Sequence, residues 1–287
     1  MPVIDTHVHL WDVGTLTYPW LASEPRLRPR YGIADLGSEA DRLAGLVVVE
    51  AGCRPDLALA EVAWVKSLAA RWPVIRGMVA QAPLERGPDG LADLAGHLVG
   101  DGLHVVGVRR NVQDEPPGFM VHERFIAGVN ALATLSLPFD ACIREYQLRE
   151  LTELADRTPA VVIVLDHLGK PDIRTHSAAS RSRTTHAWFA DLANLALRQN
   201  VVVKLSGLAT ESDHERWREQ DIEPYLTHAI EVFGPNRCLY GSDWPVATLA
   251  TTYERWRHLV EAVIADLSAT ARADILTGTA QRVYGLA

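Results

Sequence analysis

The chain has 287 residues, of which 48% are hydrophobic and 22% charged, so it is long and apolar enough to bury a sizeable core. Its net charge of −8 argues against nucleic acid as a partner, because phosphate binding needs a basic surface. The chain starts without a basic, apolar leader and has no run of about 18 apolar residues. We therefore expect a cytoplasmic protein that does not enter a membrane, and the sequence leaves a homo-oligomer open.

Short apolar runs rich in β-branched residues alternate with amphipathic segments along the chain. The runs predict eight strands, at 3–10, 46–50, 75–81, 105–111, 138–143, 161–167, 201–206 and 238–243. The amphipathic segments predict helices at 56–72, 91–99, 122–135, 146–157, 186–199, 215–233, 252–267 and 270–276, with Asp56 as the N-cap of the first. Two stretches, 11–31 and 172–185, are predicted to be irregular.

This alternation predicts a parallel sheet with helices on both faces. Eight repeats favour closure into a (β/α)₈ (TIM) barrel, an α/β fold in which residues 1–287 form a single domain. An open, doubly wound sheet is the alternative, but the first strand is not followed by the glycine-rich phosphate loop that would support it. Because barrel enzymes carry their catalytic groups at the carboxyl ends of the strands, we look for functional residues there.

The first predicted strand ends in Asp-Thr-His-Val-His, with histidines at positions 7 and 9. Strand alternation places His7 and His9 on one face, about 7 Å apart along the strand. Two inward-facing imidazoles at this spacing are able to reach one metal ion. The alternative is that both are buried histidines without a ligand role.

The sixth predicted strand ends at His167, after five apolar residues. Its position at the point where the strand leaves the core, together with the histidine pair of the first strand, favours a functional role. Asp166 alternates to the other face, where we expect a structural hydrogen bond, for example to a backbone amide.

Two carboxylates end other strands. Asp243 follows the eighth strand, beside the first once the barrel closes, where a carboxylate can bind a metal ion or take a proton from water. The alternative is that Asp243 is a turn residue before Pro245. Glu50 follows three valines, and the sequence leaves it open as a solvated strand end or an inward ligand.

Three cations lie near strand ends. Arg109 and Arg110 face opposite sides of the fourth strand, so only one points inward, where a guanidinium suits a carboxylate or lactone carbonyl. Lys204 interrupts an apolar strand, and a buried lysine needs a partner, which we expect to be Asp166, Asp243 or the substrate.

The chain resembles the amidohydrolase-2 family, and more narrowly its lactonase branch. The resemblance rests on an ordered set of motifs that covers nearly the whole chain, at 6–12, 18–20, 107–114, 165–171, 204–208, 233–235 and 241–246. It implies a barrel enzyme that hydrolyses a cyclic ester with an activated water.

The resemblance also implies the roles of the site residues. Asp243 would be the general base, and His167, Arg109 or a divalent ion would polarise the carbonyl. The implied ligands of one divalent ion, zinc in some members of the branch and absent from others, are His7, His9, Glu50, His167 and Asp243. Members with two metal ions place a modified lysine on the fourth strand, where this chain has arginines, so we expect no second ion.

The implied substrate is a small lactone, and an aldonolactone suits the residues at the strand ends. Trp11, Trp20 and Trp244 are candidates for apolar walls against a sugar face, although packing at the barrel rim explains them as well. Arg109 and Gln113 are the candidates for binding substrate oxygens, and Lys204 is a further candidate for substrate binding. A dicarboxylate lactone would instead need several arginines, which Arg174, Arg181 or Arg183 could supply.

Two other functions remain open at this stage. A metal-dependent decarboxylase of an aromatic or unsaturated carboxylate could use the same scaffold and the same ligands. A non-catalytic sugar-binding barrel is the second alternative, and the intact set of three histidines and an aspartate argues against it.

Overall fold

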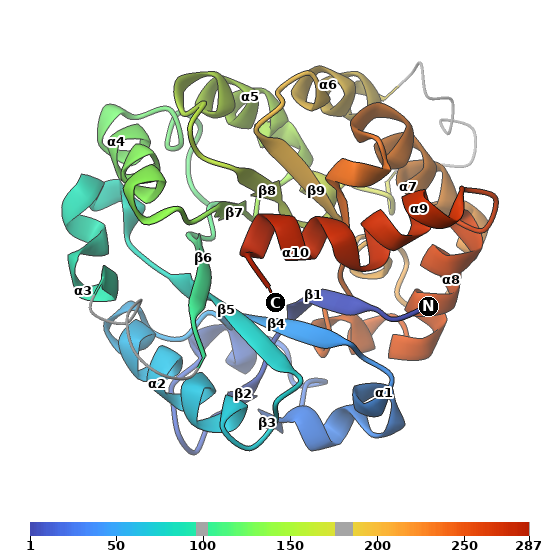
Figure 1. The fold of residues 1–287 in the computed structure, drawn as a ribbon, viewed down its shortest axis with the longest axis horizontal. Helices are drawn as coiled ribbons and strands as arrows, with labels where there is room; N and C mark the ends of the chain where they lie inside the picture. The colour runs from blue at the N-terminus through green and yellow to red at the C-terminus, as the bar shows by residue number, and fades with distance from the viewer. Residues whose placement is uncertain (96–102, 176–185, 287) are drawn as a thin grey trace.

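The computed structural model describes residues 1–95, 103–175 and 186–286, and within them eight parallel strands form one barrel (Figure 1). In barrel order the strands are β1 (Ile4–Val8), β4 (Gly45–Val49), β5 (Ile75–Gln81), β6 (Val105–Arg109), β7 (Phe139–Ala141), β8 (Ile163–Leu165), β9 (Val201–Leu205) and β10 (Cys238–Tyr240). Each overlaps one of the eight predicted runs, and only β4 begins one residue before its run. The predicted TIM barrel is therefore confirmed.

The seam between β1 and β10 closes the barrel. Val8 forms a parallel bridge with Trp244, and the amide of Asp243 donates to the carbonyl of His7 at 2.9 Å. Beneath the seam, the buried carboxylate of Asp5 accepts hydrogen bonds from the Ser242 amide and the Tyr253 hydroxyl, both at 2.9 Å. These bonds hold the ends of the first and last strands together.

Helices surround the barrel (Figure 1). They are α1 (Ser38–Asp41), α2 (Ala58–Ala69), α3 (Ala92–Ala95), α4 (Glu123–Ala131), α5 (Leu148–Arg157), α6 (Ala187–Ala196), α7 (Glu219–Phe233) and α8 (Tyr253–Val263). Asp56 does not cap α2: it lies in a 3₁₀ turn, Pro55–Leu57, and its carboxylate binds the Arg54 guanidinium. Parts of the predicted helix at 91–99 and of the predicted loop at 172–185 lie outside the described residues.

The chain ends across the amino-terminal opening of the barrel. Helices α9 (Ala269–Ala273) and α10 (Thr279–Tyr284) flank a π-helical turn, and α10 crosses the front of the barrel in Figure 1. Ala280, Tyr284 and Leu286 pack against apolar side chains from the barrel interior, including Val164 and Val202. The ring of Tyr284 therefore reaches into the barrel from its amino-terminal end.

The stretch at 11–31 covers the opposite, carboxyl-terminal end beside β1. It is not wholly irregular, because β2 (Trp11–Asp12) and β3 (Arg30–Tyr31) form a small antiparallel sheet. Trp11 at its base packs edge-on against Trp20 and Tyr31, with ring centroids 5.5 and 5.2 Å apart. Within the three described ranges, no helix has both the length and the apolar character needed to cross a bilayer.

Candidate active site

The two histidines of the first strand face each other at the carboxyl end of the barrel. Nε2 of His7 lies 3.2 Å from Nε2 of His9, and both side chains are buried. Nδ1 of His9 lies 3.0 Å from the carbonyl oxygen of Val49, which can only accept a hydrogen bond. Nδ1 therefore carries the proton of a neutral His9, and its Nε2 presents a lone pair to the site.

His167 reaches the same place through an unusual turn. After β8 ends, His167, Leu168, Gly169 and Lys170 all have φ between 50° and 71°, in the left-handed region. Such strain persists where the surrounding structure enforces it, and it is common at functional sites. The turn brings the His167 ring to 4.3 Å from that of His7, while its Nδ1 lies 2.9 Å from the hydroxyl of Ser206.

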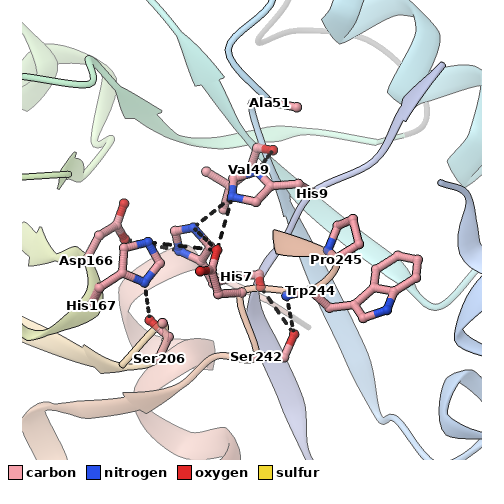
Figure 2. A network of polar contacts seen from close by, with 12 residues as sticks. His7, His9, Val49, Ala51, Asp166, His167, Ser206, Ser242, Trp244 and Pro245 are labelled. Atoms are coloured by element: carbon pink, nitrogen blue, oxygen red, sulfur yellow. Dashed lines mark hydrogen bonds and ion pairs between the residues drawn. The ribbon is translucent and has the colours of Figure 1, made fainter. Parts of the chain in front are cut away.

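Asp243 completes the group. Its Oδ1 lies 3.5 Å from Nε2 of His9, 3.8 Å from Nε2 of His7 and 4.0 Å from Nε2 of His167. Figure 2 shows the ring of His7 between those of His9 and His167. The four residues, predicted from three separate strand ends, are thus brought together.

The arrangement fits one divalent metal ion. A tetrahedral zinc site with bonds of about 2.0–2.1 Å has ligand atoms roughly 3.3 Å apart. The contacts between His7, His9 and Asp243 span 3.2 to 3.8 Å, and the ligand atoms of His7, His167 and Asp243 all lie within 4.8 Å of one another. The histidine nitrogens and the carboxylate oxygen are donors that zinc accepts.

Burial and neighbouring charges keep these groups in the protonation states that a metal ligand needs. Burial lowers the pKa of His7 well below its ordinary value and that of His167 to about 4, so both rings are neutral at neutral pH. Burial alone would raise the pKa of Asp243, but His167, His9 and His7 outweigh it and lower that pKa below its usual range. Asp243 is therefore ionised, as a metal ligand or a general base must be.

Glu50, which the sequence leaves open as a ligand, is bound by other groups. One carboxylate oxygen accepts from Nε of Arg109 at 2.6 Å, and the other accepts from the Gly52 amide at 2.7 Å. Arg109 is inward-facing as predicted, and Arg110 points away to Glu85. Nε and Nη2 of Arg109 both donate to Glu50, the first to its carboxylate and the second to its backbone carbonyl. Only Nη1 lies near the histidines, 3.4 Å from Nε2 of His7.

Asp166 and Lys204 lie beneath the histidines. Asp166 lies two residues after Val164, which faces the barrel interior, so Asp166 also points inward and the predicted outward orientation is wrong. The prediction used strand alternation to place His167 inward, but His167 reaches the site through the left-handed turn. Oδ1 of Asp166 lies 3.2 Å from Nδ1 of His7 and 3.0 Å from Nζ of Lys204. Lys204 is completely buried and also binds Asp140 at 2.5 Å, so its ammonium has no surface for the predicted substrate contact.

The three tryptophans differ in their access to the mouth. Trp11 is fully buried, with Nε1 donating to the carbonyl of Arg28, so it cannot line a substrate pocket as predicted. Trp244 is 5% exposed and packs against Tyr31. Trp20 is partly exposed and bonds the Ala51 carbonyl, so it remains a candidate wall.

Lys170 is a cation that the sequence reasoning missed. Its Nζ donates to Oε1 of the predicted substrate-binding residue Gln113 at 2.5 Å. Burial opposes its charge, but Cys142, Glu211 and Asp243 raise the pKa of Lys170, so it stays an ammonium near Asp243. Its place at the end of the strand that carries His167 was the available signal.

Comparison with known proteins identifies the class. The amidohydrolase family model matches residues 4–286, and the chain belongs to this family. It is 34% identical to a protein named L-fucono-1,5-lactonase from Burkholderia multivorans, over 99% of this chain and 96% of that one.

Solved structures agree with this assignment. The crystal structure of an amidohydrolase from Burkholderia multivorans with bound zinc has a TM-score of 0.85 and 33% identity, covering 100% of both chains. The 2,6-dihydroxybenzoate decarboxylase from Rhizobium has a TM-score of 0.63 and 16% identity over 99% of each chain, a likeness of fold alone.

Proposed function

We propose that this chain is a hydrolase that opens a small lactone, an aldonolactone such as L-fucono-1,5-lactone, by attack of an activated water. The observation that carries the proposal is the convergence of three histidine Nε2 atoms on Oδ1 of Asp243 at the barrel mouth. The full-length relative named L-fucono-1,5-lactonase supports the choice of substrate class. No feature of the site favours decarboxylation over hydrolysis.

The proposed ligands of one zinc ion are His7, His9, His167 and Asp243, without Glu50. The likeness to a zinc-containing amidohydrolase supports zinc as the metal. When bound, the ion lowers the pKa of water and polarises a carbonyl oxygen.

The chain's own groups account for proton movement and substrate binding. Ionised Asp243 takes the proton of the attacking water and returns it to the alkoxide that leaves as the ring opens, so that water is added across the C–O bond. His167, fixed by Ser206, neighbours this proton path. Lys170 and Gln113 bind ring or hydroxyl oxygens of the lactone, and Trp20 covers its apolar face.

A lactone panel tests the proposal. The purified protein is offered aldonolactones, a dicarboxylate lactone and aromatic carboxylates, while acid release and CO₂ release are recorded in parallel. We expect acid release from aldonolactones that falls after zinc is removed by a chelator and returns when zinc is added. Release of CO₂ without acid, or ligand-induced stabilisation without turnover, would contradict the proposal.

A further inference from the structure

Below the histidines, a row of buried polar groups runs down the inside of the barrel to the last helix. The hydroxyl of Tyr284 in α10 donates to Oδ2 of Asp140 in β7 at 2.8 Å. The same oxygen accepts from Nζ of Lys204 in β9 at 2.5 Å. Lys204 then contacts Asp166 and His7. All of these side chains lie within the closed interior, and the mechanism above uses none of them except His7.

The two neighbours of His7 at this level favour opposite tautomers. Nδ1 of His7 lies 3.2 Å from Oδ1 of Asp166 and 3.2 Å from Nζ of Lys204. The ionised carboxylate can only accept a hydrogen bond and favours a proton on Nδ1, whereas the ammonium can only donate and favours a proton on Nε2. A neutral imidazole carries one of these protons and not both.

Only one of the tautomers suits a metal ligand, although without an ion the lone pair on Nε2 of His9, 3.2 Å away, is an acceptor for a proton on Nε2 of His7. With the proton on Nδ1, Nε2 of His7 offers its lone pair toward Asp243 and His9, as a metal ligand must. Nη1 of Arg109, a pure donor, lies 3.4 Å from the same Nε2 and favours the same tautomer. With the proton on Nε2, the ligand atom is blocked.

We infer that Asp140 and Tyr284 are positioning residues that bind the Lys204 ammonium, so that it donates to carboxylates rather than to Nδ1 of His7, and thereby select the tautomer in which Nε2 is unprotonated. Asp140 is the nearest partner of the ammonium, at 2.5 Å, and Tyr284 fixes the carboxylate oxygen that makes this contact. Asp166 then accepts the hydrogen bond that Nδ1 of His7 donates. The last helix, on the far side of the barrel from the mouth, thereby takes part in setting the active-site geometry.

This inference rests on the proposed role of His7 as a ligand, but its first readout needs neither metal nor substrate. The protein is labelled with ¹⁵N-histidine and freed of metal, and ¹H–¹⁵N spectra record which ring nitrogen of His7 is protonated. The His7 signals are assigned by their loss in His7→Gln. The second readout is zinc affinity, measured by competition with a chelating dye.

Three variants test the inference, and a fourth is the control. Asp140→Asn, which keeps the shape of the side chain, should move His7 toward the Nε2 proton and weaken zinc binding by roughly 10- to 100-fold. Lys204→Met combined with Asp140→Asn removes the competing donor and should restore both the Nδ1 proton and most of the affinity. Tyr284→Phe should shift both readouts in the direction of Asp140→Asn by a smaller factor.

Leu286→Ala is the matched control in the same segment. Its side chain packs in the same interior cluster without a polar contact, so it should lower thermal stability and leave the tautomer unchanged. The inference is overturned if Asp140→Asn and Tyr284→Phe leave the tautomer as in the wild type, or if the double variant is as impaired as Asp140→Asn. A wild type that binds no zinc would instead refute the proposed metal site, whatever the tautomer shows.

Discussion

A Cβ atom on Gly207 would lie 2.3 Å from Nδ1 of His167, a distance that no pair of unbonded atoms tolerates. Gly207 also has φ +68°, in the region that favours glycine. The absence of a side chain at this position, directly after β9, is therefore what leaves room for the His167 ring against Ser206. The His167 ring therefore reaches the other ligand atoms only because residue 207 has no side chain.

Gly207→Ala should displace His167 and lower kcat by roughly 100-fold, because misplacing a reacting or ligating group by about 1 Å costs that much. Gly37→Ala is the control, since Gly37 has φ +58° but a Cβ there meets nothing within 4 Å. It should share the backbone strain and keep full activity. Steady-state kinetics with zinc analysis of both variants checks this, and an active Gly207→Ala would show that His167 is not needed where it lies.

Asp243→Asn should reduce kcat by roughly 100- to 10,000-fold, because the amide cannot take a proton from water. The fold should survive, since the backbone of residue 243 keeps its bond to the His7 carbonyl. Asp114→Asn is the control at the same end of the barrel, where the Asp114 side chain is 76% exposed and pairs with Arg144. Equal rates for the two variants would remove Asp243 as the base.

Lys170→Met should raise KM by roughly 10- to 100-fold with a smaller effect on kcat, because it removes a charged donor proposed to bind substrate oxygens. Arg110→Met, two strands away in the barrel, removes a cation that faces outward to Glu85 and Glu115, and its KM should not change. A drop in kcat without a rise in KM would instead assign Lys170 to the reacting centre.

Glu61 gives a prediction about stability and pH. Burial and the nearby Glu50 carboxylate raise the pKa of Glu61 to about 8 in the folded protein, above its value of about 4.3 in an unfolded chain. Folding therefore favours the neutral acid, and its contribution to stability is complete below about pH 4.3 and lost as the pH rises through 8.

Glu61→Gln, a neutral mimic, should accordingly gain in Tm relative to the wild type between pH 5 and pH 9. Glu223→Gln, at an exposed position of α7, should show no such gain. Thermal unfolding of the three proteins across this range is the measurement. A difference between Glu61→Gln and wild type that stays constant with pH would contradict the raised pKa.

The sequence was sufficient to predict the barrel, because apolar runs and amphipathic segments alternate strongly enough to define every strand. It also predicted which histidines and which aspartate meet, since strand ends share one face of a barrel. It failed where contacts depend on packing rather than on pattern. Asp140 stands alone in an apolar run, and nothing local reveals that a lysine from β9 and a tyrosine from the last helix meet it.

Two other residues show the same limit. Trp11 was a candidate for a substrate wall, with packing at the barrel rim as the alternative, and the small β2–β3 sheet buries it. Asp166 was assigned to the outer face because strand alternation was used to place His167 inward, whereas β8 ends at Leu165 and His167 enters the site through a left-handed turn. A sequence pattern does not show where a strand stops and a left-handed turn begins.

The seam between β1 and β10 has a consequence for biosynthesis. His7 and His9 leave the ribosome early. Ser242, which bonds the His7 carbonyl, lies 235 residues later in the chain, and Asp243 and Trp244 follow it directly. At about 5–20 residues per second, the nascent chain holds two metal-binding imidazoles without their carboxylate partner for roughly 10–50 s. With the proposed ligands, the complete metal site therefore forms only after the final strand has emerged.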